Sequence, residues 1–380
     1  MTKAQTTARR EETTPVAPRR DGNGAHGAHE DPKRETRGGS AAGRRFRPED
    51  YLDHPIAIIG SGGFGTTLAV LLAKKGYEVN QWVRNEKQSW IMREKRENQK
   101  YLPGVTLPLN IYISQSLPAT VERARIAVIA VPSQAVREAA ETLLPCITDP
   151  DSIIVNVAKG IEHDTYLRMS EVIADVVGDQ NPIVTLSGPN HAEEIGRDMP
   201  GATVVASNRP ECLPVVCEMF STRSFKVFPH TDLVGVELGG VTKNIVALAT
   251  GICDGIGYGD NTRSAIITLG LSEMIRFGRA MGAKKETYMG LAGLGDLIAT
   301  CTSPHSRNRH VGEQLGRGES LDEILESMHG KVAEGVPATR FVHEYALKHG
   351  IDLPLTGQIY KVLFEGKPVT EGARDLLKLM

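Results

Sequence analysis

Strand-like runs alternate with helical patterns between residue 54 and about residue 230. The runs are "IAIIG", "EVNQWVR", "IAVIAVP", "SIIVNVAKG", "PIVTLSGPN" and "ATVVAS". The first, third and fourth are almost entirely apolar, which is typical of strands that are covered on both faces. Helical stretches lie between several of these runs. The alternation therefore predicts an α/β fold with a parallel, doubly wound sheet of the Rossmann type.

The pattern changes at about residue 236, where strand-like runs give way to helical patterns with glycine breaks. The clearest of these, "GVELGGVTKNIVALATGI" at 235–252, predicts a buried helix. Residues 1–53 differ from both parts, because they contain almost no large apolar side chains. Such a segment cannot bury enough surface to offset its ordering entropy. We therefore expect a disordered tail at 1–53, an α/β domain at 54–235 and an all-helical domain at 236–380.

Composition excludes several classes of function. The chain has 380 residues, of which 40% are hydrophobic and 24% charged, as in an ordinary globular protein with room for two cores. The net charge of -2 gives no argument for nucleic-acid binding. Because there is no run of roughly 18 apolar residues, no transmembrane helix is expected. The five cysteines have no CxxC spacing, which favours free thiols in a reducing cytoplasm, and no metal site is expected.

Three glycines follow the first predicted strand, in the stretch "IAIIGSGGFGTTLAVLLAKKG". The spacing Gly60-x-Gly62-x-x-Gly65, after a strand and at the start of a helix, indicates dinucleotide binding. Gly60 permits the turn, Gly62 lets the backbone approach a pyrophosphate, and Gly65 lets helix and strand pack closely. The helix N-terminus adds free N–H groups and the positive end of a dipole. A glycine-rich turn without a ligand is the alternative.

The end of the next predicted strand bears on which dinucleotide binds. An NAD site usually places an acidic residue there, on the ribose 2′-hydroxyl. Here Arg84 and Asn85 occupy the region, and the nearest acidic residue is Glu86. Because a guanidinium group suits a 2′-phosphate, the sequence favours NADP over NAD. Stacking of Arg84 on the adenine, or its exposure to solvent, is the alternative.

Polar turns end three later strands, at residues 131–134, 158–162 and 187–194. Ligands bind at the carboxyl ends of the strands of an open parallel sheet, so we expect these turns to border one site. Lys159 is predicted to emerge there and to bind a carbonyl oxygen or a phosphate, with a solvated loop lysine as the alternative. Gly188 and Asn190 stand at the start of a predicted helix, where backbone donors are available. No role is assigned to His191.

Lys243 and Asn244 interrupt the apolar pattern of the predicted buried helix. A buried lysine is costly unless it is paired or functional, and Gly239–Gly240 one turn earlier would let a ligand approach. We therefore predict that Lys243 is a general acid/base, with a lysine that extends to the surface as the alternative. Asp296 follows a glycine turn and could either cap a helix or orient Lys243.

The stretch "SRNR" places Ser306, Arg307 and Asn308 together. An arginine with neutral donors is a phosphate-binding chemistry. Taken with the glycine turn and the two lysines, it describes a nicotinamide enzyme that acts on a small phosphorylated substrate through a lysine acid/base.

From Ile56 to the C-terminus the chain resembles the bacterial NAD(P)-dependent glycerol-3-phosphate dehydrogenases. The resemblance is carried, in order, by "GSGGFGTTLA", "AVPSQAVR", "AKGIE", "LSGPNHAEEI", "GVELGGVTKNIVALATGI", "GLAGLGDLIATCTSPHSRNR" and "KVAEGV". The segments around Lys243 and Arg307–Asn308 are its most specific signatures. Phe64 and Asn190 depart from the family, which often has Trp and Ser at these positions. The tail is not part of the family pattern.

The resemblance implies a role for each matching residue. Beyond the three motif glycines, the implied cofactor contacts are Gly63, Phe64, Arg84, Asn85, Lys159, Ala192, Arg307, Val332 and Glu334. The implied substrate contacts are Lys159, Gly188, Asn190, Lys243, Asn244, Asp296, Ser306, Arg307 and Asn308. Lys243 would be the proton acceptor, with Lys159 and Asp296 as the other catalytic residues.

The resemblance also implies a reaction. It is the reversible reduction of dihydroxyacetone phosphate to sn-glycerol 3-phosphate with NADP or NAD, for glycerophospholipid synthesis, in a cytoplasmic homodimer. Two alternatives stay open. One is another enzyme of the same two-domain architecture, which would reduce a 2-oxo or 3-oxo acid. The other is a non-catalytic dinucleotide sensor, which need not retain Lys159, Lys243, Asp296 and Arg307 together.

Overall fold

The computed structural model describes residues 46–328 and 331–378. All of these residues lie in one compact unit, Arg45–Met380. The expected division between residues 235 and 236 therefore stays a prediction.

The predicted tail at 1–53 lies outside the described residues as far as residue 45. Its boundary at residue 53 is wrong, because the last part of this range is ordered. Residues Pro48–Tyr51 form a turn of 3-10 helix, and the buried Tyr51 donates a hydrogen bond to the Asp151 backbone oxygen at 2.9 Å. The Phe46 ring lies under the Arg209 guanidinium, 5.7 Å from its carbon. A few aromatic anchors thus fix a segment whose composition predicts disorder.

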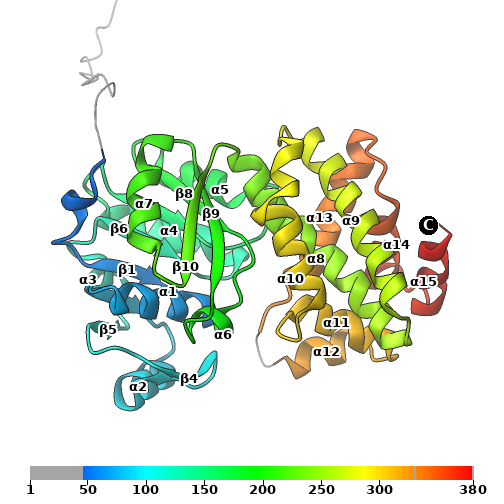
Figure 1. Cartoon of the computed structure of the whole chain (residues 1–380), viewed down its shortest axis with the longest axis horizontal. Helices are drawn as coiled ribbons and strands as arrows, with labels where there is room; N and C mark the ends of the chain where they lie inside the picture. Colours follow the sequence, from blue (N-terminus) through cyan, green and yellow to red (C-terminus); the bar gives the residue numbers. More distant parts are fainter. Residues whose placement is uncertain (1–45, 329–330, 379–380) are drawn as a thin grey trace, which may run out of the picture. The chain divides into compact units, whose positions relative to one another are not determined.

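One sheet of eight strands forms the first half of this unit (Figure 1). The strands are β1 (Ile56–Ile59), β2 (Val79–Trp82), β5 (Ile111–Ser114), β6 (Ile126–Ile129), β7 (Ile153–Asn156), β8 (Ile183–Ser187), β9 (Gly201–Ser207) and β10 (Phe225–His230). Their order across the sheet is β10-β9-β8-β7-β6-β1-β2-β5. A separate antiparallel ribbon contains β3 (Glu97–Asn98) and β4 (Leu102–Thr106).

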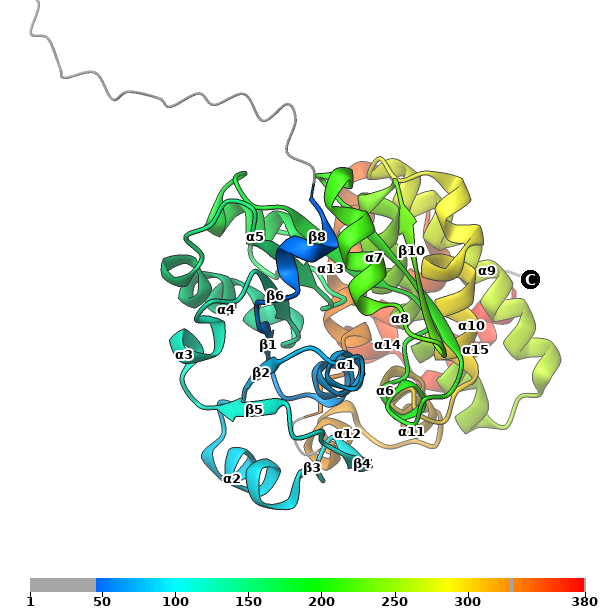
Figure 2. The same cartoon turned by 60° about the vertical axis from the view of Figure 1, so that its left-hand side comes forward.

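All neighbouring strands of the sheet are parallel except β8 and β9, which pair antiparallel. The predicted parallel sheet is therefore present, with this one pair as a departure from it. The reason lies in the connection between them, whose only helix, α6, has the four residues Ala192–Ile195. A helix of that length rises about 6 Å, too little to carry the chain back along a strand of about 17 Å. Strands β9 and β10 then run side by side in parallel register; Figure 1 labels both, and Figure 2 shows β10 from another direction.

Alternate residues of β1 face two different layers of helices. Ile56 and Ile58 pack into one apolar cluster with α1 and α7, whereas Ala57 and Ile59 pack into another with α3, α4 and α5. These helices are α1 (Gly63–Lys74), α3 (Leu117–Val121), α4 (Val136–Leu143), α5 (Met169–Val177) and α7 (Leu213–Phe220), and α2 (Glu86–Lys95) lies beyond β2. Because both faces of the sheet are covered, the prediction of a doubly wound sheet is confirmed.

Helices form the regular structure of the described residues after His230, which confirms the predicted helical region. They are α8 (Leu233–Ile256), α9 (Asp260–Ala280), α10 (Asp296–Thr302), α11 (Arg307–Gly316), α12 (Leu321–Ser327), α13 (Gly335–His349), α14 (Pro354–Phe364) and α15 (Val369–Leu377). Asp232 caps α8 by accepting from the Gly235 N–H at 2.9 Å, and Gly257 ends it with φ of 93°.

The central helix α8 is long and apolar enough, by length and composition, to cross a membrane. However, 89% of its most apolar window is buried inside the molecule. Helices α9, α10, α11, α13 and α14 pack around it. It is therefore the core helix of the helical half.

Helices α8 and α11 touch backbone to backbone through glycines. A Cβ on Gly312 would lie 2.1 Å from the Leu248 carbonyl oxygen, and one on Gly316 would lie 2.4 Å from that of Ile252. From the other side, Gly251 and Gly255 are equally close to the backbone of α11. This contact fixes α11 along its length against the second half of α8.

Candidate active site

The glycine turn between β1 and α1 leaves room only at its middle glycine. Gly60 has φ of 125°, and a Cβ there would lie 2.3 Å from the Ala130 carbonyl oxygen. A Cβ on Gly65 would lie 2.9 Å from that of Ala130, so this glycine allows α1 to pack against the neighbouring strand end. Gly62, the residue before α1, has no atom within 4 Å of such a position. The turn thus offers an open backbone surface beside the free N–H groups of a helix N-terminus.

Three further predicted cofactor residues lie around this turn. Gly63 is crowded, since a Cβ there would meet the Tyr101 carbonyl oxygen at 2.8 Å and the Ala192 Cβ at 3.3 Å. The Ala192 carbonyl oxygen accepts from Thr67 of α1 at 3.0 Å, which ties the start of α6 to α1. Phe64 is partly buried and packs against the sheet core.

Arg84 and Asn85 follow β2, as the sequence predicts. The Arg84 side chain is 75% exposed, and the nearest carboxylate oxygen, on Glu138, is 4.0 Å from its Nη1. The guanidinium is therefore free to take another anion. Asn85 caps α2, because its side-chain oxygen accepts from the Gln88 N–H at 2.9 Å.

A single carboxylate joins the two predicted lysines. Asp296, at the start of α10, is buried, and its Oδ1 accepts from the Lys243 Nζ at 2.5 Å. Its Oδ2 accepts from the Lys159 Nζ at 2.6 Å. Lys243 is 6% exposed in the middle of α8, which excludes a surface lysine, and Lys159 emerges just after β7. Asp296 makes no capping bond of its own, so of its two predicted roles the structure shows the contact with Lys243.

Burial and charge act in opposite directions on this cluster. Burial lowers the pKa of Lys243 to about 8, helped by repulsion from Lys159 and opposed by the attraction of Asp296. Burial alone would raise the pKa of Asp296, but the two ammonium groups outweigh it and hold that pKa below its usual range. Lys243 is therefore a base that titrates close to neutral pH beside an acid that stays ionised.

Thr300 is a member of this cluster that the sequence analysis missed. Its hydroxyl accepts from the Lys243 Nζ at 2.6 Å and donates to the Asp296 backbone oxygen at 2.7 Å. Since Thr300 lies four residues after Asp296 on α10, the two side chains share one helix face. That spacing was the available signal.

The turn after β8 brings Gly188 and Asn190 to the same place. The Gly188 carbonyl oxygen accepts from the Lys159 Nζ at 2.9 Å. A Cβ on Gly188 would lie 2.9 Å from the Thr203 Oγ1, which also accepts from the Asn190 amide at 3.0 Å. The Asn190 Oδ1 is buried and has no hydrogen-bond partner within the described part of the chain, so it is an acceptor available to a ligand.

The residues of the "SRNR" stretch differ in their surroundings. Ser306 caps α11 by accepting from the Arg309 N–H. Arg307 is exposed and has no ion-pair partner among residues 46–328 and 331–378. Asn308 is buried and donates to the Asn244 Oδ1 at 2.8 Å, while its own oxygen accepts from the Gly335 N–H at 2.8 Å. Asn308 and Asn244 thus join α11, α8 and α13, and the free charge of the stretch is Arg307.

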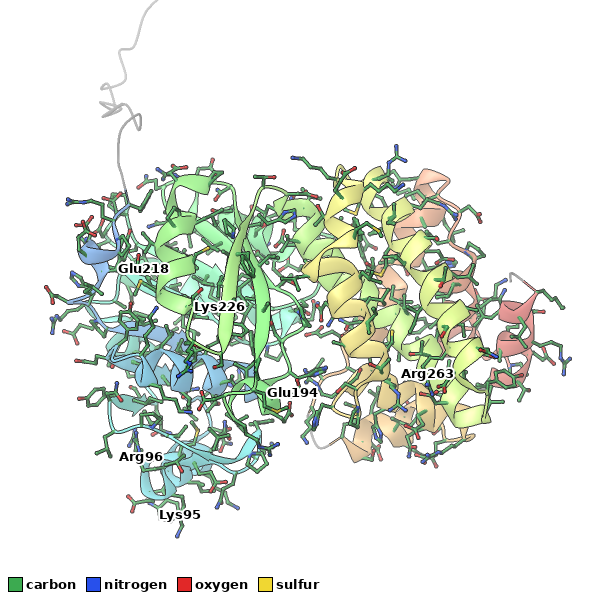
Figure 3. The ribbon with its side chains drawn as sticks, viewed as in Figure 1. Lys95, Arg96, Glu194, Glu218, Lys226 and Arg263 are labelled. Carbon is green, nitrogen blue, oxygen red and sulfur yellow. The ribbon has the colours of Figure 1, made fainter. Side chains whose placement is uncertain are left out.

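A buried ion pair network holds α11 in place. The Asp254 side chain, 7% exposed near the end of α8, accepts from Arg309 of α11 at 2.8 Å and from Arg263 of α9 at 3.0 Å. Figure 3 labels Arg263 on α9. Arg309 is therefore structural, whereas Arg307 two residues earlier remains uncommitted.

Glu334 and Val332 lie just before α13, and Glu334 contacts the other half. Its two carboxylate oxygens accept from the Ser133 N–H at 3.0 Å and from the Ser133 Oγ at 2.7 Å. Ser133 belongs to the turn after β6 that the sequence predicts to border the site. Val332 is exposed.

His191, for which the sequence suggested no role, packs between the halves. It lies next to the Ala299 carbonyl oxygen at 3.3 Å, and burial lowers its pKa, so it is mostly neutral. Its side-chain hydrogen bond goes to that backbone oxygen and not to the lysines or Asp296, although the charge of Lys243 also contributes to its lowered pKa.

Comparisons with known proteins agree over both halves. Residues 55–213 match the family described as the NAD-dependent glycerol-3-phosphate dehydrogenase N-terminus, and residues 232–374 match the corresponding C-terminus. The chain is 47% identical over 327 residues to the NAD(P)+ glycerol-3-phosphate dehydrogenase of Moorella thermoacetica, which covers 86% of this chain and 96% of that protein. It is 48% identical over 324 residues to that of Prosthecochloris aestuarii, at 85% and 97% coverage. The crystal structure of glycerol-3-phosphate dehydrogenase from Coxiella burnetii superposes with a TM-score of 0.82, at 39% identity, and covers 86% of this chain and 99% of that one.

Proposed function

Because the chain belongs to the NAD-dependent glycerol-3-phosphate dehydrogenase family and is an NAD(P)-dependent oxidoreductase, we propose that Lys243 is the general acid/base of its reaction. That reaction interconverts dihydroxyacetone phosphate and sn-glycerol 3-phosphate. The observation that carries the proposal is the buried ammonium group of Lys243. Asp296 and Thr300 accept hydrogen bonds from two of its three N–H groups, which leaves the third N–H for a substrate oxygen.

The glycine turn fits the dinucleotide. Its open middle position and the start of α1 suit a pyrophosphate, so we assign the pyrophosphate to Gly60, Gly62, Gly63 and Gly65. The reduced nicotinamide of the bound cofactor supplies the hydride. The remaining cofactor contacts in this proposal are Phe64, Arg84, Asn85, Lys159, Ala192, Arg307, Val332 and Glu334.

A preference for NADP over NAD rests on Arg84. Its guanidinium is exposed, and the long contact with Glu138 does not neutralise it. An exposed guanidinium without a close carboxylate can bind the 2′-phosphate of NADP through paired hydrogen bonds.

The substrate is assigned to residues from both halves. Arg307 is the free cation that would bind the phosphate, with Ser306 and Asn308 beside it at the start of α11. Asn190 adds a buried acceptor for a substrate hydroxyl, and Gly188 lies next to Lys159. Asn244 and Asn308 bond each other, so they act on the substrate site mainly by holding α8 and α11 together.

The proton steps follow from the hydrogen bonds of Lys243. During reduction, negative charge grows on the carbonyl oxygen, and the Lys243 ammonium stabilises it and donates its third proton. Lys159, whose other bonds go to Gly188 and Asp296, adds a second cation. In the reverse direction, neutral Lys243 still donates its two N–H groups in hydrogen bonds to Asp296 and Thr300. Its lone pair then points where the third proton was, and accepts the proton of the substrate hydroxyl.

The finer expectations belong to this proposal as well. We propose a cytoplasmic homodimer that serves glycerophospholipid synthesis, with a division between an α/β domain and a helical domain near residue 235. The relatives' names support the reaction itself, and these further points extend the family resemblance.

The experiment that tests the proposal compares Lys243→Met with the unchanged chain. Consumption of NADPH or NADH by dihydroxyacetone phosphate is followed by absorbance, and NADPH binding by fluorescence. We expect turnover to fall by about 10²–10⁴-fold while NADPH binding is kept, because only the proton donor is lost. The control is Lys95→Met, which changes an exposed lysine of α2. Turnover close to normal in Lys243→Met would overturn the assignment, and the ratio of rates with NADPH and NADH tests Arg84.

A further inference from the structure

The connection between β7 and α5 crosses from the sheet to the helical half. We call residues 160–168 the strap. It begins directly after Lys159 and ends at Arg168, the residue before α5. Ile161, two residues after Lys159, is 4% exposed, and its side chain belongs to the apolar core of the helical half rather than to either core of the sheet.

Tyr166 is a second anchor of the strap on the helical half. Its ring centroid lies 5.3 Å from that of Phe341 on α13, and its hydroxyl donates to the Glu344 Oε2 at 3.1 Å. Tyr166 reaches this position with φ of 60°, in the left-handed region that bulky residues avoid. A bulky residue keeps such a conformation only where its contacts outweigh the strain.

Hydrogen bonds make the strap one stiff loop. Ile161 and Arg168 form an antiparallel bridge, and the Glu162 N–H donates to the Leu167 carbonyl oxygen at 3.0 Å. The Tyr166 N–H donates back to the Glu162 carbonyl oxygen at 3.0 Å, which closes the tip. A displacement at the tip is therefore transmitted to Ile161 and its neighbours.

Both ends of the strap are also tied to neighbouring helices. The Gln134 side chain, near the start of α4, donates to the Ile161 carbonyl oxygen at 2.7 Å. Arg137 of α4 makes a paired contact with Glu162 at 2.8 and 2.9 Å. At the far end, Arg168 bonds Glu237 of α8. These bonds leave the loop little freedom, and the Arg168–Glu237 pair adds a polar contact with the helical half to the anchors Ile161 and Tyr166.

We propose that the strap positions Lys159 against Asp296 and Lys243, with Ile161 and Tyr166 as its positioning residues. This inference rests on the proposed function, in which these two lysines and the carboxylate meet the substrate. The contacts of the strap described above are with α4, α8 and α13 and not with the glycine turn. It acts by keeping Lys159, which follows a strand of the sheet, at a fixed place relative to a helix of the other half.

The position of Lys159 has a measurable electrostatic consequence for Lys243. The charged and titratable groups that face Lys243 are Asp296 and Cys301 on α10, Lys159 after β7 and His191 before α6. If Lys159 moves away, Lys243 loses its repulsion and no longer shares the carboxylate. The pKa of Lys243 then rises. Oxidation of glycerol 3-phosphate needs neutral Lys243, so the increase of the oxidation rate with pH moves to higher pH. Reduction needs the ammonium form, so the decrease of the reduction rate with pH also moves to higher pH.

The test uses the full chain with five single substitutions. Tyr166→Asn removes the ring. Asparagine tolerates the left-handed backbone conformation at this position, so any loss of activity is not due to added backbone strain. Tyr166→Phe keeps the ring contact, Ile161→Val trims the buried anchor, and His163→Ala changes an exposed strap residue whose side chain makes no bond within the described chain. Lys159→Met gives the pH profile for complete loss of the second cation. Each variant is measured for kcat, KM, pH profile and thermal midpoint.

We expect Tyr166→Asn to lower kcat/KM for dihydroxyacetone phosphate by about tenfold, with the loss mainly in kcat, because small misplacements of catalytic groups have effects of this size. Its pH profile should move toward that of Lys159→Met, and combination with Ile161→Val should move it further. Tyr166→Phe should retain most of the activity of the unchanged chain. His163→Ala should have the same kinetic constants and pH profile as the unchanged chain.

Two results would overturn the inference. One is a pH profile of Tyr166→Asn that superposes on that of the unchanged chain while Lys159→Met is shifted. The other is an activity loss in Tyr166→Asn that only parallels a fall in thermal midpoint. The proposed function fails separately, if Lys243→Met keeps its turnover.

Discussion

Asp296 divides its two carboxylate oxygens between two lysines, and the proposed chemistry of the site rests on this division. Two ammonium groups and one carboxylate leave a net positive charge in a buried place, which suits a developing oxyanion. The sequence predicts that Lys243 is buried, and it gives contact with Lys243 as one of two roles for Asp296. It does not show that Lys159 shares the carboxylate, because that contact spans 137 positions and depends on how the two halves meet.

At the same scale, Thr300 is predicted to hold Lys243 in its working orientation. Thr300→Val removes the hydroxyl with little change of volume and leaves a buried N–H of Lys243 without its acceptor. Such a loss costs about 1–3 kcal/mol, so we expect kcat to fall by about 5- to 150-fold. The pKa of Lys243 should fall further, since the ammonium loses an acceptor. The rise of glycerol 3-phosphate oxidation with pH should therefore move to lower pH.

Thr300→Ser is the matched control, because it keeps the hydroxyl at the same place. It should retain most of the turnover and the original pH profile. Equal kinetics for the Val and Ser variants would mean that the hydroxyl does not act on Lys243.

At the scale of elements, the sequence predicts continuous apolar strands better than edge strands. β10, which the sequence analysis missed, alternates buried Phe225 and Val227 with exposed Lys226 and Phe228. It also contains Pro229, which is tolerated there because the strand is at the edge of the sheet. A continuous apolar run indicates a strand that is covered on both faces. An edge strand shows only alternation of apolar and polar residues, which is a weaker signal than a continuous run.

The packing of α11 on α8 supports the proposed substrate site, because Arg307 and Asn308 lie at the start of α11. In Gly312→Ala, the new Cβ would meet the Leu248 carbonyl oxygen at 2.1 Å, and a backbone atom of a core helix cannot move aside easily. We expect the free energy of unfolding to fall by about 1–3 kcal/mol. Because Asn308 and Arg307 start α11, the KM for dihydroxyacetone phosphate should rise as well. Chemical denaturation and steady-state kinetics measure the two effects.

Gly357→Ala provides the comparison within α14. The nearest atom to a Cβ there is on His343 at 3.7 Å, an ordinary contact, and alanine favours helix by about 1 kcal/mol over glycine. This variant should be as stable as the unchanged chain or more so. If both alanine variants behave alike, the close contact of α8 and α11 is not what limits stability.

At the scale of the whole molecule, the strand ends assemble one edge of the site and the helical half supplies the other. The sequence predicts the first part, since the turns after β7 and β8 were expected to meet, and Lys159 does bond Gly188. It could not predict the second part in detail. The Glu334 contact with Ser133, for example, joins residues 201 positions apart and is specified by the packing of α13, not by any local pattern.

This contact gives a direct measure of how strongly the halves are coupled. Glu334 accepts from both the N–H and the hydroxyl of Ser133, so Glu334→Ala removes a charged partner from a part-buried place. A double-mutant cycle of Glu334→Ala and Ser133→Ala should give a coupling energy of about 0.5–3 kcal/mol in the free energy of unfolding. A control cycle replaces Glu334→Ala by Glu138→Ala and keeps Ser133→Ala. It should give no coupling energy, because Glu138 is exposed and its nearest cation, Arg84, is 4.0 Å away. Additive effects of Glu334→Ala and Ser133→Ala would mean that the halves are held by other contacts, of which the Lys159–Asp296 pair and the strap are the next to test.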